Sequence, residues 1–99
     1  MLKVSTEQEK DQAVLRIEGK LIDPWTKELE AAWRDIATKL AGKKLLLDIR
    51  ATTFIDQRGV ELLQKIVRVS NTMILADSPL TRQFARKVRQ FETNREGKE

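Results

Sequence analysis

The predicted fold depends most on residues 44–63, KLLLDIRATTFIDQRGVELL. Residues 45–49 form an apolar run that is interrupted only by Asp48. A short run without alternation is typical of a strand that is buried on both faces, usually a central and parallel one. From Val60 to Val67, apolar residues recur at helical spacing. The stretch therefore predicts a strand, a loop over residues 50–56 and a helix.

The flanking sequence supplies the other strands. Residues 12–18 alternate between apolar and polar side chains and end at Gly19, and Leu2 and Val4 precede them at the same spacing. The polar residues 7–11 can turn the chain back, so these two segments predict a hairpin. A second apolar run, residues 73–76, follows the helix and predicts a right-handed parallel crossover.

Two further helices are expected at Asp23-Pro24 and at Ser78-Pro79, where a capping residue precedes a proline at the first helical position. The first helix should end at Gly42, with Trp25 and Trp33 packed on the sheet. The second should bury one apolar stripe and leave residues 93–99 as a frayed tail. The stripe consists of Leu80, Phe84, Val88 and Phe91.

These elements predict one α/β domain. Ninety-nine residues leave no room for a second core. We expect a single-domain sandwich over residues 1–99, with its core in residues 2–91. Its sheet should be mixed and mostly parallel, with four to five strands and about three helices.

The composition restricts the function. The chain contains neither cysteine nor histidine, which removes the commonest metal ligands and the commonest general base. No apolar run approaches the length of a membrane span, and the N-terminus lacks a signal-peptide core, so we expect a cytoplasmic protein. The net charge of +4 is ordinary for a small soluble domain and does not by itself indicate nucleic acid.

A binding site is expected where the parallel strands end, because loops and helix N-termini meet there in open α/β sheets. The informative loop leads through Phe54 and Ile55 to Asp56, an acidic helix cap, and then to Gly59 inside the first helical turn. Glycine there indicates either a close approach to the backbone by a partner or tight packing of the helix on the sheet.

Three motifs, which follow one another along the chain, resemble those of the STAS family of bacterial anti-sigma factor antagonists. The apolar strand ending in Asp48, followed by residues 54–59, is similar to a family signature that ends in Phe-Ile/Met-Asp-Ser-Ser-Gly. Residues 14–23 are similar to the family's second strand and its exit, and residues 73–77 fit the strand after the signature helix. The resemblance covers residues 2–91 and implies a non-enzymatic regulator that binds a protein partner, most often an anti-sigma factor with a serine kinase fold.

The chain departs from the signature at its two serines, which are Gln57 and Arg58 here. The resemblance implies that the second serine is the phosphorylation site. Arginine offers no hydroxyl group and carries a permanent positive charge, so the serine phospho-switch is expected to be missing. Thr52 and Thr53 are the remaining hydroxyl groups of the loop, and we expect them to be ordinary turn residues.

The expected partner-binding surface combines the loop, the first turn of the helix after it and two neighbouring strand exits. It consists of Asp23, Thr52, Thr53, Phe54, Ile55, Asp56, Gln57, Arg58, Gly59 and Asp77. No catalytic residue, metal or cofactor is expected.

Three alternatives remain open from the sequence. The chain could be a fixed STAS subunit of a larger signalling or transport assembly. It could bind a nucleotide or a metal ion, because Asp48, Asp56 and Asp77 all follow strands, although no glycine-rich phosphate loop is present. It could also bind nucleic acid through a basic stripe on the last helix, although a solvated helix face explains that stripe as well. The stripe consists of Arg82, Arg86 and Arg89.

Overall fold

The structure, a computed structural model, describes residues 1–97 and the side chains as far as Gln90. The described elements are β1 (Leu2–Gln8), β2 (Gln12–Leu21), α1 (Thr26–Ala37), β3 (Lys44–Ile55), α2 (Gln57–Val69), β4 (Thr72–Leu75) and α3 (Pro79–Gly97). The predicted α/β class is confirmed, with four strands and three helices in this part of the chain.

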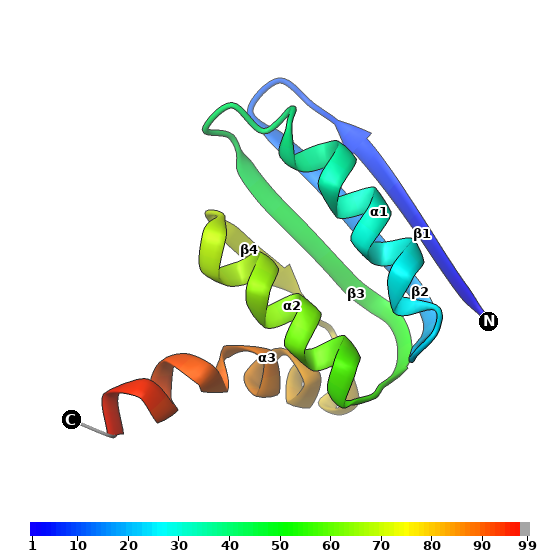
Figure 1. Cartoon of the computed structure of the whole chain (residues 1–99), viewed down its shortest axis with the longest axis vertical. Helices are drawn as coiled ribbons and strands as arrows, with labels where there is room; N and C mark the ends of the chain where they lie inside the picture. Colours follow the sequence, from blue (N-terminus) through cyan, green and yellow to red (C-terminus); the bar gives the residue numbers. More distant parts are fainter. Residues whose placement is uncertain (98–99) are drawn as a thin grey trace.

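The strands form one mixed sheet in the order β1-β2-β3-β4. β1 pairs antiparallel with β2, as the predicted hairpin requires, and β2, β3 and β4 are mutually parallel. Figure 1 shows α1 and α2 lying side by side over one face of this sheet, with α3 packed next to α2. The C-terminal ends of β2 and β3 therefore meet the N-terminal ends of α1 and α2 at one edge of the domain.

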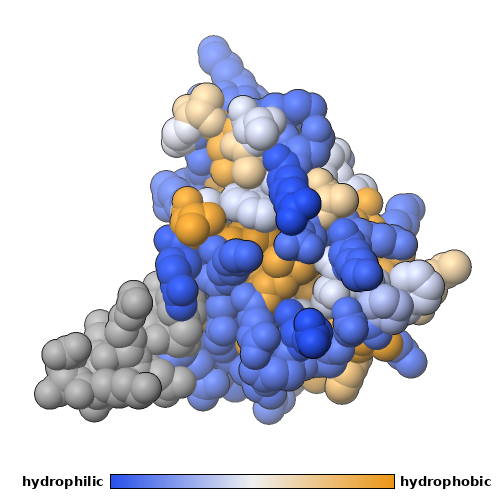
Figure 2. All heavy atoms as spheres, viewed as in Figure 1, coloured by the Kyte–Doolittle hydropathy of each residue, from blue (hydrophilic) through white to orange (hydrophobic). Residues whose placement is uncertain are grey.

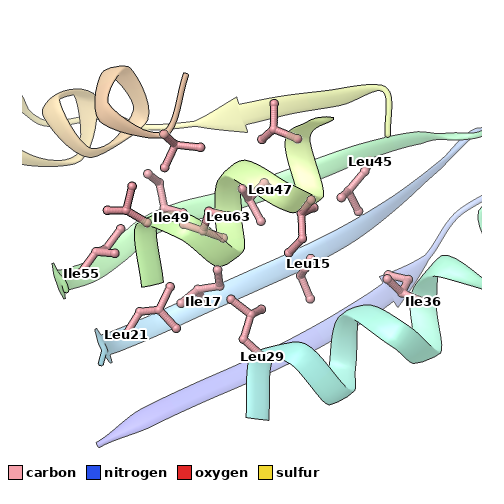
Figure 3. Packing of buried hydrophobic residues seen from close by; sticks show 14 of the residues in the cluster. Leu15, Ile17, Leu21, Leu29, Ile36, Leu45, Leu47, Ile49, Ile55 and Leu63 are labelled. Carbon is pink, nitrogen blue, oxygen red and sulfur yellow. The ribbon is translucent and has the colours of Figure 1, made fainter. Parts of the chain in front are cut away.

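The core lies between the sheet and these helices (Figure 3). Alternate residues of β2 and β3, such as Leu15 and Leu47, point toward the helices and are fully buried. Leu29 of α1, Leu63 of α2 and Val88 of α3 close the core from the other side. Each such side chain contributes about 1.5–3 kcal/mol by its removal from water.

The strand β3 is longer than the sequence predicts. Residues 50–55, predicted as a loop, continue β3 and pair with the end of β2, with Ile55 opposite Leu21. Two register shifts interrupt this pairing, and each inserts an extra residue into β3. The Thr52 hydroxyl, which is buried, donates to the Ile17 carbonyl at 2.8 Å. The loop prediction was wrong because bulges let a polar segment without regular alternation stay in the sheet.

The prediction that Asp23 caps α1 was also wrong. The helix begins at Thr26 with Trp25 as its N-cap, and it ends at Ala37 instead of Gly42. The Asp23 carboxylate instead accepts a hydrogen bond from the Thr26 hydroxyl at 3.1 Å. Because Trp25 precedes the helix, its side chain lies outside the buried stripe and is 41% exposed, whereas Trp33 packs against the core.

The last two elements differ from expectation in their exposure. Met73 of β4 lies opposite Leu46, on the sheet face that α1 and α2 do not cover, so it is 49% exposed instead of being buried on both faces. Leu80 is exposed in the first turn of α3, while Thr81 is buried in its place. The helix α3 continues through residues 93–97, which were expected in a frayed tail, and residues 98–99 lie outside the described part. Within residues 1–97, no helix is both long and apolar enough to cross a membrane.

Candidate functional site

The first turn of α2 is held in place by Asp56. Its carboxylate Oδ1 accepts from the Gly59 amide at 2.8 Å and caps the helix, as the sequence predicts. Its Oδ2 accepts from the Asp23 amide at 2.9 Å, and its own amide donates to the Leu21 carbonyl at 3.1 Å. One carboxylate thus joins the turn after β2 to the N-terminus of α2.

Gly59 lets this turn approach the sheet closely. A Cβ atom at this position would lie 2.7 Å from the Leu21 carbonyl oxygen and 2.8 Å from Cγ2 of Ile55. At these distances the end of β2 and the Ile55 side chain would have to move to admit a Cβ atom. The glycine is therefore explained by the packing of α2 on the ends of β2 and β3, the second of the two interpretations of the sequence.

The outer side of the same turn faces solvent. Gln57 and Arg58 are exposed, and the Gln57 amide reaches the Glu61 carboxylate at 3.3 Å. Arg58 borders a hollow of about 220 Å³ between α1 and α2, together with Glu30 of α1 and Lys65 of α2. Figure 2 shows apolar surface between hydrophilic side chains on the face that carries these two helices.

Two aromatic side chains beside this turn are exposed. Phe54 is 51% exposed and Trp25 is 41% exposed. Each lies within two residues of the hydrogen bond between Asp23 and Asp56, so both belong to the same end of the sheet. Phe54 was a predicted member of the site, whereas Trp25 was predicted to pack on the sheet because its spacing fits the helical stripe. Aromatic residues are enriched in the buried centres of protein interfaces.

The remaining predicted site residues do not share one exposed surface. Thr53 is exposed, whereas Thr52 and Ile55 are buried in the sheet. Asp77 is exposed at the end of β4, where it borders a different hollow, of about 280 Å³. That hollow is lined by Arg16 and Arg50 on the sheet face opposite the helices. The predicted surface therefore divides into an exposed part near α2, a buried part, and Asp77.

The sequence did not reveal a cluster around Asp48. This aspartate is buried on the sheet face opposite the helices, and its Oδ2 accepts from Nη2 of Arg50 at 2.9 Å and from Nε of Arg16 at 3.1 Å. Its Oδ1 accepts from Nε of Arg50 at 3.0 Å. These hydrogen bonds, those of Arg50 first, hold the pKa of Asp48 well below its ordinary value. The side-chain hydrogen bond to Asp48 likewise raises the pKa of both arginines.

The three aspartates considered as a metal site do not converge. Asp48 and Asp77 border the hollow on the sheet face opposite the helices, which we call the open sheet face. Asp56 instead caps α2 and accepts a hydrogen bond from the Asp23 amide. The Asp48 carboxylate is already occupied by two guanidinium groups. Within the described chain, no group of three or more acidic side chains is arranged to hold a metal ion.

Solved structures similar to this chain share its architecture. An anti-sigma factor antagonist from Mycobacterium paratuberculosis superposes with a TM-score of 0.77 at 16% identity, covering 95% of this chain and 82% of that one. The unphosphorylated anti-sigma factor antagonist SpoIIAA gives 0.64 at 21% identity, covering 82% and 79%. A STAS domain of an antisigma-factor antagonist from Rhodobacter sphaeroides gives 0.57 at 22%, covering 76% and 84%.

No protein-family model matches the sequence, and no curated protein matches it. The structural likeness shows that the chain has the SpoIIAA-like fold of STAS domains. The fold expected from the motifs in the sequence is therefore confirmed.

Proposed function

We propose that this chain is a non-enzymatic bacterial regulatory protein that binds a protein partner of the anti-sigma factor class. Contact is made through the α2-turn surface, which we define as Asp23, Trp25, Phe54, Gln57 and Arg58. The observation that carries the proposal is the exposed first turn of α2, fixed by Asp56 and Gly59 at the end of a SpoIIAA-like sheet.

The chemistry of this surface supports docking. Trp25 and Phe54 offer large apolar groups that gain free energy when a partner removes them from water. Arg58 adds a positive charge at the N-terminus of α2, where the helix dipole is also positive. Such a surface favours a partner with acidic residues around an apolar contact.

The same turn lacks the means for serine phosphorylation. Asp56 and Gly59 match the family signature, but the position of the phosphorylated serine is occupied by Arg58. In the same segment, the Thr52 hydroxyl is buried and donates to a β2 carbonyl, so only that of Thr53 is exposed. The chain is then an antagonist whose docking is not interrupted by phosphate at the usual position.

The charge of Arg58 gives the first testable prediction. Arg58→Glu should weaken binding to a kinase-fold anti-sigma factor from the source bacterium about 5- to 150-fold more than Arg58→Ser. Reversal places like charges in the interface, whereas serine removes only the attraction, a difference of about 1–3 kcal/mol. Calorimetry at two salt concentrations measures both affinities.

Arg82→Glu is the matched control, because it makes the same charge reversal at an exposed site on α3. It should bind as the parent does. Equal affinities for the two Arg58 variants would show that Arg58 makes no acidic contact. Absence of binding by the parent chain would contradict the proposed partner class itself.

A further inference from the structure

The strand β1 is an open edge of the sheet. It pairs with β2 on one side and runs along the outer rim of the domain (Figure 1). At the opposite edge, β4 spans only four residues, and Nη2 of Arg89 donates to its Thr72 carbonyl at 3.0 Å. Among the described residues, β1 therefore presents the longer row of unpaired backbone groups, which is a template for another strand.

The register of the hairpin shows which backbone groups face outward. The Lys20 amide donates to the Met1 carbonyl at 3.3 Å, and the Glu9 amide donates to the Gln12 carbonyl at 2.8 Å. The register between these points is continuous. Because hydrogen-bonded pairs alternate in an antiparallel ladder, odd-numbered residues of β1 bond to β2. The amides and carbonyls that point away belong to Leu2, Val4, Thr6 and Gln8.

We propose that β1 of one copy pairs antiparallel with β1 of a second copy, about a two-fold axis through Ser5. This register places Val4 opposite Thr6 of the second copy, as a hydrogen-bonded pair. It also places Lys3 directly opposite Glu7 of the second copy, twice across the axis. The outward backbone groups and the charges are thus satisfied by one and the same register.

The side chains of β1 fit this self-pairing. Lys3, Thr6 and Glu7 are exposed, and the strand contains neither proline nor an irregularity in its pairing. Glu7 lies 3.7 Å from Arg16 on the open sheet face, so Lys3 of the second copy would approach its other side. A single strand pair buries less than the roughly 1,200 Å² of stable complexes, so the dimer is weak and depends on concentration.

Ser5→Cys tests the register directly. Ser5 would lie opposite Ser5 of the second copy as a non-hydrogen-bonded pair. The two Cα atoms would be about 4.5 Å apart, within reach of a disulfide bond. The chain has no cysteine, so this thiol is the only one present. We expect a covalent dimer under mild oxidation, seen by mass spectrometry. Lys3→Cys is the matched control. In this register, position 3 of the second copy would lie four residues away, about 13 Å along the strand, so the two thiols should not cross-link.

Sedimentation velocity over a range of concentrations tests the pairing without a cross-link. Thr6→Pro removes an outward amide that β2 does not use, so it should abolish the dimer while circular dichroism stays unchanged. Lys3→Glu should also weaken the dimer, and adding Glu7→Lys should restore it. The proposal is overturned if the parent chain stays monomeric up to about 1 mM, if Lys3→Cys cross-links as readily as Ser5→Cys, or if Thr6→Pro leaves the dimer intact.

Discussion

Gly59→Ala is expected to destabilise the folded chain by about 1–3 kcal/mol. The added Cβ would lie 2.7 Å from the Leu21 carbonyl oxygen, a backbone atom that can move only if the end of β2 moves. The helix propensity of alanine acts in the opposite direction and offsets at most about 1 kcal/mol. Urea denaturation followed by circular dichroism measures the difference in unfolding free energy.

Arg58→Ala is the control for this prediction, because it introduces alanine next to Gly59 on the exposed side of the same turn. We expect its unfolding free energy to stay within about 0.5 kcal/mol of the parent value. A neutral or stabilising effect of Gly59→Ala would contradict the close packing of α2 on the ends of β2 and β3.

Asp48→Asn is expected to lower the free energy of unfolding by about 2–3 kcal/mol at neutral pH. This is less than the full cost of breaking a buried ion pair, because the arginine partners are partly exposed. The aspartate side chain is only 3% exposed, whereas those of Arg16 and Arg50 are 36% and 50% exposed. The asparagine retains the shape but loses the charge that both guanidinium groups contact. Asp35→Asn, at an exposed pair with Lys39, should change stability by less than about 1 kcal/mol.

The stability difference between the parent and Asp48→Asn should become smaller as the pH falls. The folded state holds the pKa of Asp48 below its ordinary value of 3.8, so the unfolded chain takes up a proton first as the pH falls. The stabilisation by the Asp48 carboxylate is complete well above pH 3.8 and declines below it. The difference between the parent and Asp48→Asn should therefore be constant near neutrality and shrink in acid. A constant difference down to pH 3 would contradict the charged cluster.

The sequence predicted the elements whose periodicity is regular. The apolar run around Leu47 became β3, one of the two interior strands, and the spacing from Val60 to Val67 became the buried face of α2. The cap at Asp56 was also predicted, because capping depends on residues adjacent in the chain. Here, the local pattern and the tertiary packing favour the same structure.

The errors occurred where tertiary contacts override local preference. Asp23 has the sequence of a helix cap, but Asp56, 33 residues away, binds its amide, and its carboxylate accepts from Thr26. Trp25 is displaced from the buried stripe in consequence and joins the candidate site. The Asp48 cluster could not be predicted, because Arg16 is brought to Asp48 by the pairing of β2 with β3.

The most direct test of the proposed function is backbone chemical-shift mapping of the labelled chain with a kinase-fold anti-sigma factor from the source organism. The spectra locate the contact without any substitution. Docking through the α2-turn surface predicts that the largest shifts fall on residues 22–25 and 53–59, with α3 largely unaffected. Shifts confined to α3, or to the open sheet face around Arg50, would contradict it.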